Sequence, residues 1–403
     1  IVKDCKRYAF GILDEVLTPS PDRIPVDCAV AGPCGGCSLR HLDYAAELRA
    51  KQENVADAFA RIGGLDVPVL PIVGSPEVNR YRNKVQFPVG VDKSGKPCIG
   101  FYAGRTHRIV PCPDCRLQPG VLNEIGNALC AFFAEKGIQP YSEETGRGLV
   151  RHIFLRRGAH SGQIMVCLVC TRAKLPSAEE LCTRLKAQFA EITTILLNVN
   201  AKNTNVILGT ETHTLYGQGY IEDTLCGVPV QLGPLSFYQV NTLAAEQLYG
   251  IAAQYAQLTP DDLLLDLYCG MGTIGLSMAA HCRELIGVEI VPEAIESAKA
   301  NAARMGADVA AKSRFFCADA GQAATRLAAE GLHPDIVMLD PPRKGCDEAT
   351  LSAVVRMSPR RVVYVSCNPA TAARDAAWLE QNGYHAEKVQ PVDLFPRTRH
   401  CEC

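Results

Sequence analysis

A glycine-rich segment, LLLDLYCGMGTIGLSMAA at residues 263–280, has the composition of a ligand-binding turn. Gly270, Gly272 and Gly275 follow an apolar run and open a helical pattern in G-x-G-x-x-G spacing. Such glycines let a ligand approach bare backbone at a helix N-terminus. The spacing therefore predicts a cofactor site, and by itself it fits a nicotinamide dinucleotide as well as other cofactors that carry adenosine.

Polar residues lie at the ends of the apolar runs that follow this turn. Glu289 lies in ELIGVEI, where an acid accepts hydrogen bonds from ribose hydroxyls. Asp319 in FFCADA, Asp340 in DPPR and Cys367 in SCNP end later runs. Because the carboxyl ends of parallel strands meet at one edge of a sheet, we expect these side chains beside a single crevice. The alternatives are that Asp319 only caps its helix and that Glu289 is a solvated strand end.

A set of cysteines has metal-ligand spacing. Cys28, Cys34 and Cys37 read C-x5-C-x2-C, and Cys112 and Cys115 follow in PCPDC. Four thiolates gathered from a loop and a distant segment suit either zinc or an iron–sulfur cluster, and spacing does not choose between them. The alternative is a group of unlinked, reduced thiols.

The composition is that of a globular protein. The chain has 403 residues, 47% of them hydrophobic and 21% charged, which predicts two or three domains. No run approaches the roughly 18 apolar residues of a membrane span, and no signal-peptide pattern opens the chain. We therefore expect a soluble, cytoplasmic protein whose other cysteines are mostly reduced core residues. The net charge of -2 gives no overall nucleic-acid signature.

Two patterns of secondary structure are predicted to position these groups. Between Tyr81 and Val206 short strands alternate with turns, which indicates an α+β domain on an antiparallel sheet. From Leu235 onward strands alternate with helices, which indicates an α/β domain with a parallel, doubly wound sheet. The predicted helices lie at 42–61, 120–136, 177–189, 273–281, 292–305, 319–330 and 370–382.

Taken together, the motifs resemble the RNA 5-methyluridine (uracil-C5) methyltransferase family. DLYCGMGTIGL, the acid of GVEI, LDPPRKG, VYVSCNPAT and SFYQVN carry the resemblance, and SPDR, CGGC and RTRHCE fit the family's landmarks in order along nearly the whole chain. The C-x5-C-G-G-C pattern is similar to that of the iron–sulfur branch that acts on 23S ribosomal RNA. The resemblance implies a Rossmann-like methyltransferase domain that uses S-adenosyl-L-methionine.

The resemblance also implies roles for individual residues. Some relatives have asparagine at the position of Thr273. Phe237 is expected to stack on a flipped base, and Gln239 and Asp340 are expected to contact the uracil as well as the cofactor. The residues implied at the cofactor are Gln239, Tyr268, Gly270, Thr273, Glu289, Asp319 and Asp340.

Cys367 and Glu402 are the implied catalytic pair. Carbon 5 of uracil becomes nucleophilic when a thiolate adds to carbon 6. Cys367 precedes the helical pattern NPATAARD, so a helix N-terminus should favour its thiolate. The resemblance assigns removal of the carbon 5 proton to Glu402. Glu402 is the penultimate residue, whereas relatives continue further, and we expect it to be frayed.

For the cysteines, the resemblance implies a [4Fe–4S] cluster. Cys28, Cys34, Cys37 and Cys115 are the implied ligands, and Cys115 fits better than Cys112 because of the CRLQP that follows it. Methylation needs no redox step, so we expect the cluster to be structural or to take part in RNA recognition.

The resemblance also suggests domain limits. Residues 1–25 would be the tail of an N-terminal β-barrel RNA-binding domain of the TRAM-like type. Residues 26–234 would form the central domain with the cluster, and 235–403 the methyltransferase domain, on which 46–75 could also pack.

The expected partner is large-subunit ribosomal RNA, with transfer RNA as the alternative, and the protein is expected to be a monomer. A nicotinamide-dependent oxidoreductase would share the glycine turn but leave SCNP and DPPR unexplained. A non-catalytic RNA-binding protein would keep the cysteines and basic clusters without needing Cys367. The basic side chains that could contact phosphates are Arg80, Arg82, Lys84, Arg105, Arg108, Arg151, Arg156, Arg157, Arg343 and Lys344.

Overall fold

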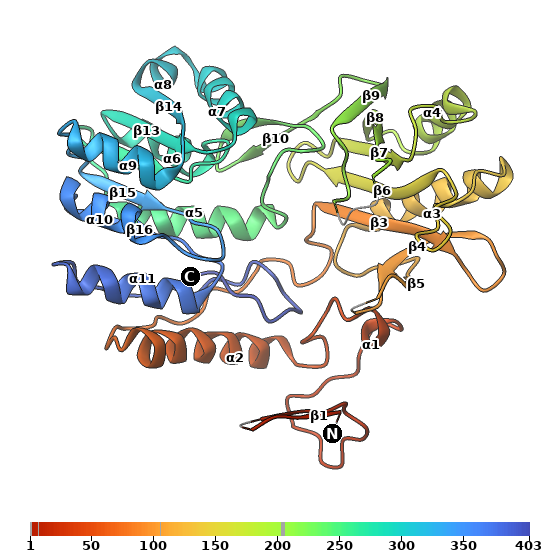
Figure 1. The fold of residues 1–403 in the computed structure, drawn as a ribbon, viewed down its shortest axis with the longest axis horizontal. Helices are drawn as coiled ribbons and strands as arrows, with labels where there is room; N and C mark the ends of the chain where they lie inside the picture. Colours follow the sequence, from red (N-terminus) through yellow and green to blue (C-terminus); the bar gives the residue numbers. More distant parts are fainter. Residues whose placement is uncertain (1, 7, 105, 203–205) are drawn as a thin grey trace.

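A computed structural model describes residues 2–6, 8–104, 106–202 and 206–403, and Figure 1 shows its helices and strands in two lobes. Arg105, one of the basic side chains considered above, lies outside the described residues. Within these ranges no helix is both long enough and apolar enough to span a bilayer.

The first lobe is built on a five-stranded parallel sheet in the order β14-β13-β12-β15-β16. This Rossmann-like arrangement confirms the predicted α/β methyltransferase fold. Three helices that the sequence analysis did not predict, α5, α8 and α10, also belong to it. The strands are β12 (Leu263–Leu267), β13 (Glu284–Glu289), β14 (Ser313–Cys317), β15 (Ile336–Leu339) and β16 (Arg361–Tyr364). The helices are α5 (Thr242–Ala256), α6 (Thr273–Met278), η2 (Ala279–His281), α7 (Pro292–Met305), α8 (Ala307–Lys312), α9 (Ala320–Ala329), α10 (Glu348–Met357) and α11 (Pro369–Gln381).

Burial of β12 on both faces explains its continuous apolar sequence. Leu263, Leu265 and Leu267 pack into one apolar cluster, and Leu264 packs into another. Successive side chains of a strand point to opposite faces of the sheet, so a continuous apolar sequence requires that both faces be covered by other elements. β12 is therefore the centre of the sheet, and the glycine turn leaves from its carboxyl end.

The second lobe is built on a seven-stranded sheet in the order β5-β4-β3-β6-β7-β8-β9. The prediction of an antiparallel sheet is wrong for one pair, because β7 and β8 run parallel. The helix α4 joins them as a crossover, which a parallel pair requires. The strands are β3 (Lys84–Val91), β4 (Pro97–Tyr102), β5 (Ile109–Pro111), β6 (Val150–Arg157), β7 (Ile164–Cys170), β8 (Ile192–Val199) and β9 (Glu211–Tyr216), with helices α3 (Gly120–Glu135) and α4 (Ala178–Gln188).

The two lobes share an apolar core. Phe154 and Met165 on the second sheet pack in the same cluster as Leu248 of α5. The hairpin of β10 (Ile221–Leu225) and β11 (Val228–Leu232) contributes to this cluster as well. The second sheet is thus fixed against the methyltransferase lobe.

The N-terminal residues form small elements at the bottom of Figure 1. The hairpin of β1 (Lys3–Asp4) and β2 (Ala9–Phe10) is exposed, so the barrel remnant stays a prediction. The helices that follow are α1 (Ala31–Cys34), α2 (Tyr44–Asp57) and the π-helical turn η1 (Ala58–Gly63). Val55 and Phe59 of these helices pack against Ala372 and Ala373 of α11, where the two helical segments lie side by side.

A buried ion network fastens α2 to the last part of the chain. Lys51 donates hydrogen bonds to Glu47 Oε1 and Asp393 Oδ1, both at 2.8 Å, and to the carbonyl of Phe395 at 3.1 Å. The backbone N–H of Arg397 donates to Glu47 at 2.7 Å. Both carboxylates are fully buried; Arg397 lies 3.6 Å from Glu47 as a second cation, so Asp393 in particular depends on the lysine for charge compensation.

We predict that Lys51→Met lowers the free energy of unfolding by about 3–5 kcal/mol, since it removes the charge that compensates buried carboxylates. Denaturant unfolding measures the loss. Lys299→Met is the matched control, because Lys299 forms an exposed pair with Glu296 and its loss should cost below about 0.5 kcal/mol. Equal stabilities of the two variants would contradict this role for Lys51.

Candidate active site and cysteine cavity

The glycine turn after β12 exposes backbone at the carboxyl edge of the sheet. Tyr268, Gly270 and Gly272 have φ angles of 66°, 56° and 79°. A Cβ atom at Gly270 would meet nothing within 4 Å, so open space lies over this residue. At Gly275 a Cβ would lie 2.8 Å from Asp266, whose carboxylate accepts the Gly275 N–H at 3.0 Å. The turn therefore needs glycine for packing at one end and offers bare backbone to a ligand at the other.

Of the three acids predicted at the cofactor, Glu289 contacts this turn and Asp319 lies at the N-terminus of α9. Glu289 accepts hydrogen bonds from the N–H of Gly270 at 3.2 Å and of Val291 at 3.0 Å. Asp319 accepts a hydrogen bond from the N–H of Gln322 at 3.1 Å. It therefore caps α9, which was the alternative considered for this residue. Neither carboxylate is fully buried. An ionised carboxylate has about four acceptor positions, so both keep capacity for ribose hydroxyls.

Gln239 and Thr273 meet through a tyrosine that the sequence analysis missed. Gln239 Nε2 donates to the Tyr249 hydroxyl at 3.4 Å, and Thr273 also hydrogen-bonds this phenol. Burial, with the charge of Asp340 nearby, raises the pKa of Tyr249 and keeps the phenol neutral. Tyr249 lies on α5, whose apolar pattern had given no sign of a polar role.

The segment around Phe237 is held by the second lobe. Arg156 is fully buried and donates to the carbonyls of Gly233 at 2.8 Å and Ser236 at 2.7 Å. Asn83 donates to the carbonyl of Gln239 at 2.8 Å. Phe237 itself is 73% exposed. An aromatic ring that is fixed at its base and open to solvent can stack on an unpaired base.

Two of the arginines that were expected to contact phosphates cannot do so. Arg156 and Arg151 are buried and hydrogen-bonded to backbone carbonyls, so neither can reach an RNA backbone. Arg80 is engaged by the Asp114 carboxylate at 2.7 and 3.0 Å. Sequence clustering alone does not distinguish a buried arginine from an exposed one.

Cys367 lies between β16 and α11, one residue before Asn368, which caps the helix, and two before Pro369 at its first turn. The expected preference for the thiolate is not seen. Burial and the nearby Glu402 raise the pKa of the Cys367 thiol, although Arg343 opposes this by its charge and a hydrogen bond. Arg343 was considered only for phosphate binding, so its contact with the thiol is new.

Glu402 is firmly placed, and the expectation that it is frayed is wrong. Its backbone exchanges hydrogen bonds with Val392 at 2.8 and 3.0 Å, and Cys403 does the same with Ser366 at 2.9 Å. Burial, with the charge of Asp340, raises the pKa of the Glu402 carboxyl to about 8. Burial likewise raises the pKa of Asp340 to about 7. Two carboxyl groups and a thiol that affect one another electrostatically thus lie at the carboxyl edge of the sheet.

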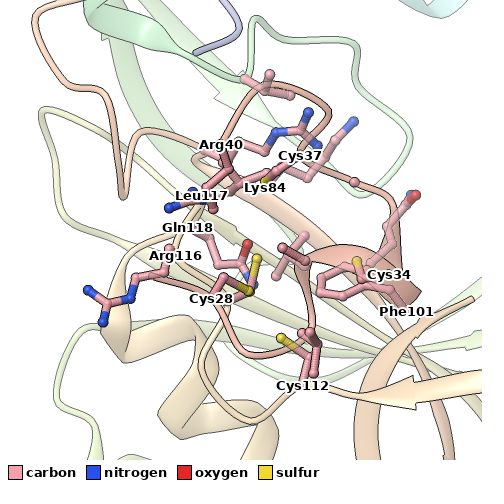
Figure 2. Close-up of a pocket in the computed structure, with 18 residues that line it drawn as sticks. Cys28, Cys34, Cys37, Arg40, Lys84, Phe101, Cys112, Arg116, Leu117 and Gln118 are labelled. Atoms are coloured by element: carbon pink, nitrogen blue, oxygen red, sulfur yellow. The ribbon is translucent and has the colours of Figure 1, made fainter. Parts of the chain in front are cut away.

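The five cysteines of the predicted cluster region line one cavity of about 260 Å³ at α1 and β4 (Figure 2). Interactions among the thiols join Cys34 and Cys37 with Cys28 and Cys115. Cys112 interacts with Cys28 and Cys34 too, and it also contacts Cys115 by a hydrogen bond. The cavity is also lined by Arg40, Arg82, Lys84 and Arg116, and no carboxylate lines it. Among the described residues, no three side chains of metal-ligating type are placed to hold a metal ion as they stand, so the cluster stays a prediction.

The fold and the site together define a Rossmann-like enzyme that binds a nucleotide-type cofactor and presents a cysteine at the same edge of its sheet. Comparison with known proteins identifies the family. Residues 158–403 match the family described as tRNA (Uracil-5-)-methyltransferase. The chain is 43% identical to an uncharacterized RNA methyltransferase of Halalkalibacterium halodurans, with all of this chain and 87% of that protein covered. It is 42% identical to one of Clostridium tetani, with 100% and 86% covered.

A solved structure agrees with this assignment. The Pyrococcus abyssi tRNA (uracil-54, C5)-methyltransferase in complex with S-adenosyl-L-homocysteine superposes with a TM-score of 0.77 at 26% identity, covering 96% of this chain and 86% of that one. The chain belongs to the RNA uracil-5-methyltransferase family. It is an enzyme that transfers a methyl group from S-adenosyl-L-methionine, and the readings as an oxidoreductase or a non-catalytic RNA-binding protein are set aside.

We predict that Arg156→Met lowers kcat/KM for RNA methylation at least about tenfold, or about 1.4 kcal/mol, because it frees the segment that carries Phe237. Steady-state methyl incorporation at several RNA concentrations measures the effect. The control is Arg172→Met, which removes an exposed arginine of the same lobe. If both variants keep the original kcat/KM, Arg156 does not position this segment.

Proposed function

We propose that this enzyme methylates carbon 5 of a specific uridine in 23S ribosomal RNA through a covalent bond between Cys367 and carbon 6 of the base. The observation that carries the proposal is the meeting of Cys367, Arg343, Asp340 and Glu402 at one edge of the parallel sheet. Methylation at carbon 5 needs a nucleophilic carbon atom. A thiol beside a buried carboxyl can make carbon 5 of a pyrimidine nucleophilic by adding to carbon 6.

The residues implied at the cofactor fit S-adenosyl-L-methionine. The open space over Gly270 admits a ligand to the backbone, and Glu289 and Asp319 are spaced along the next two strand ends. S-adenosyl-L-methionine, when bound, supplies a methyl group on a positively charged sulfonium. Acidic groups at this edge would attract that charge. The proposed lining comprises Gln239, Tyr268, Gly270, Thr273, Glu289, Asp319 and Asp340.

The proposed steps balance in protons and electrons. Cys367 Sγ, as thiolate, bonds to carbon 6, and the electron pair of the 5,6 double bond moves through carbon 5 toward the carbonyl oxygen at carbon 4. Carbon 5 would then form the bond to the methyl group while the bond between the methyl group and the sulfonium sulfur breaks and leaves its electron pair on that sulfur. The Glu402 carboxylate takes the proton from carbon 5, the 5,6 double bond forms again, and the carbon–sulfur bond breaks to release Cys367.

The charge state of the pair supports this order. The thiol and the Glu402 carboxyl both hold protons at pH 7, since the pKa of each is raised. A sulfonium cation in the crevice and the guanidinium of Arg343 both favour the thiolate. Glu402 has a pKa close to the working pH, which suits a group that must accept a proton during turnover.

The cysteine cavity bears on which RNA is the substrate. Its thiols and cationic side chains suit an anionic inorganic group, and we propose that Cys28, Cys34, Cys37 and Cys115 hold a [4Fe–4S] cluster there. The cluster would cross-link the loop at 28–37 to the segment at 115, without a redox step in methylation. The resemblance to cluster-bearing relatives favours ribosomal RNA. Transfer RNA is the second candidate, because the matched family and the Pyrococcus abyssi structure carry that name.

We also propose that residues 1–25 are the tail of a β-barrel RNA-binding domain. Their exposed hairpin leaves Tyr8 and Phe10 63% and 50% accessible, with the rings in contact edge to face. Accessible aromatic rings on a strand pair suit stacking with single-stranded bases.

A trapping experiment tests the reaction and the nucleophile. We predict that the protein, given S-adenosyl-L-methionine and a 23S ribosomal RNA transcript containing 5-fluorouridine, forms an adduct that survives denaturing electrophoresis, because fluorine cannot leave carbon 5 as a proton. Cys367→Ala should form none, and the exposed-cysteine control Cys317→Ala should form as much as the wild type. If an adduct formed with a transfer RNA transcript and not with the 23S transcript, transfer RNA would be the substrate. An adduct formed by Cys367→Ala would show that Cys367 is not the nucleophile.

Glu402 should govern the pH dependence. Its carboxyl is protonated below a pKa of about 8, so the base form grows as pH rises and the turnover rate should increase about tenfold from pH 6 to pH 7 and level off above pH 8. Glu402→Gln should lose turnover yet accumulate the adduct on ordinary uridine. Glu387→Gln, an exposed carboxyl change, is the control. A flat profile with active Glu402→Gln would assign proton removal elsewhere.

A further inference from the structure

Arg40 is a buried arginine that the reaction does not use. It follows Cys37 by three residues and is 2% exposed. Nη1 donates to Asp27 Oδ1 at 2.8 Å and to Asn79 Oδ1 at 3.1 Å. Asp27 precedes Cys28, so this ion pair connects the two ends of the cysteine loop.

The rest of the guanidinium lacks an oxygen or nitrogen acceptor. Nε and Nη2 are buried without such a partner among the residues that the structure describes, and the side chain instead meets the Cys37 thiol by a hydrogen bond. Buried donors without acceptors are costly and therefore uncommon in native structures. A guanidinium that is oriented on one side and lacks an oxygen or nitrogen acceptor on the other points to an acceptor that belongs in the cavity.

Arg40 belongs to the same cavity as the cysteines. Arg40 lines the cavity, interacts with the Cys37 thiol and acts by its charge on Cys115 (Figure 2). Arg82 and Lys84 line the same cavity, but both are only partly buried. Arg40 is the most deeply buried of the cationic side chains there. The geometry matches a donor fork aimed at sulfur.

We propose that Arg40 donates hydrogen bonds from Nε and Nη2 to sulfur atoms of the bound cluster, and that it thereby raises the cluster's reduction potential and retains it in the protein. This inference rests on the proposed cluster. Four thiolates give the site a net negative charge, and reduction adds one electron. A fixed cation therefore stabilises the reduced state more than the oxidised one, and hydrogen bonds to sulfur act in the same direction.

Arg116 is the matched control side chain. Arg116 lines the same cavity and follows Cys115 directly, but it is exposed to solvent. Solvent screening should make its charge much less effective than that of Arg40. A comparison of the two arginines thus separates a buried donor from charge in general.

The test is a redox titration with dithionite of anaerobically reconstituted protein, followed by visible absorbance and electron paramagnetic resonance. Arg40→Gln should shift the reduction equilibrium at least tenfold toward the oxidised form, about 59 mV for one electron, and should release iron to a chelator faster. Arg116→Gln should do neither. Arg40→Lys, which keeps the charge without the fork, should shift the equilibrium less.

The outcomes are distinct. Arg40→Gln with full iron content, an unchanged potential and an unchanged rate of iron loss would overturn the role of Arg40. Iron and sulfide content of the wild-type protein is measured first, and their absence would overturn both the cluster and this inference. The methylation proposal would still stand or fall separately on the 5-fluorouridine adduct.

Discussion

The parallel arrangement of five strands is the constraint on which the site depends. Parallel strands all end at one edge, so residues far apart in sequence must meet there. The glycine turn, Glu289, Asp319, Asp340 and Cys367 each follow a different strand of this sheet. Burial of these groups at that edge raises the pKa values of Asp340, Cys367 and Glu402, and the charges of neighbouring carboxylates add to the shift for Cys367 and Glu402.

Two side chains of the proposed reaction come from outside the sheet and need separate attachments. The segment with Phe237 precedes the methyltransferase strands, and buried Arg156 of the second lobe holds it by its carbonyls. Glu402 follows them, and its segment is fastened to α2 through Lys51 and Asp393. In both attachments a buried cation donates to backbone or carboxylate oxygens. The positions of these two segments therefore depend on contacts made outside the parallel sheet.

Local patterns in the sequence predicted much of this arrangement. The period of apolar residues located the strands, and strand ends beside glycine or proline located the acids and Cys367. Long-range contacts were not predicted, because they leave no local pattern. Tyr249 carried no signal in the sequence, and Arg343 and Arg156 were expected only to contact phosphates, whereas the fold places the first two in the site and buries the third. Likewise, only the fold shows that Glu402 near the chain end is held by pairing.

The central claim is that the methyl group goes to carbon 5 of uridine with loss of the proton held there. The direct measurement is release of tritium from a 23S ribosomal RNA transcript labelled with tritium at carbon 5 of its uridines, alongside methyl incorporation from S-adenosyl-L-methionine. The account predicts one tritium released for each methyl group incorporated at the target. Methyl incorporation without tritium release would place the methyl group on another atom and contradict the account.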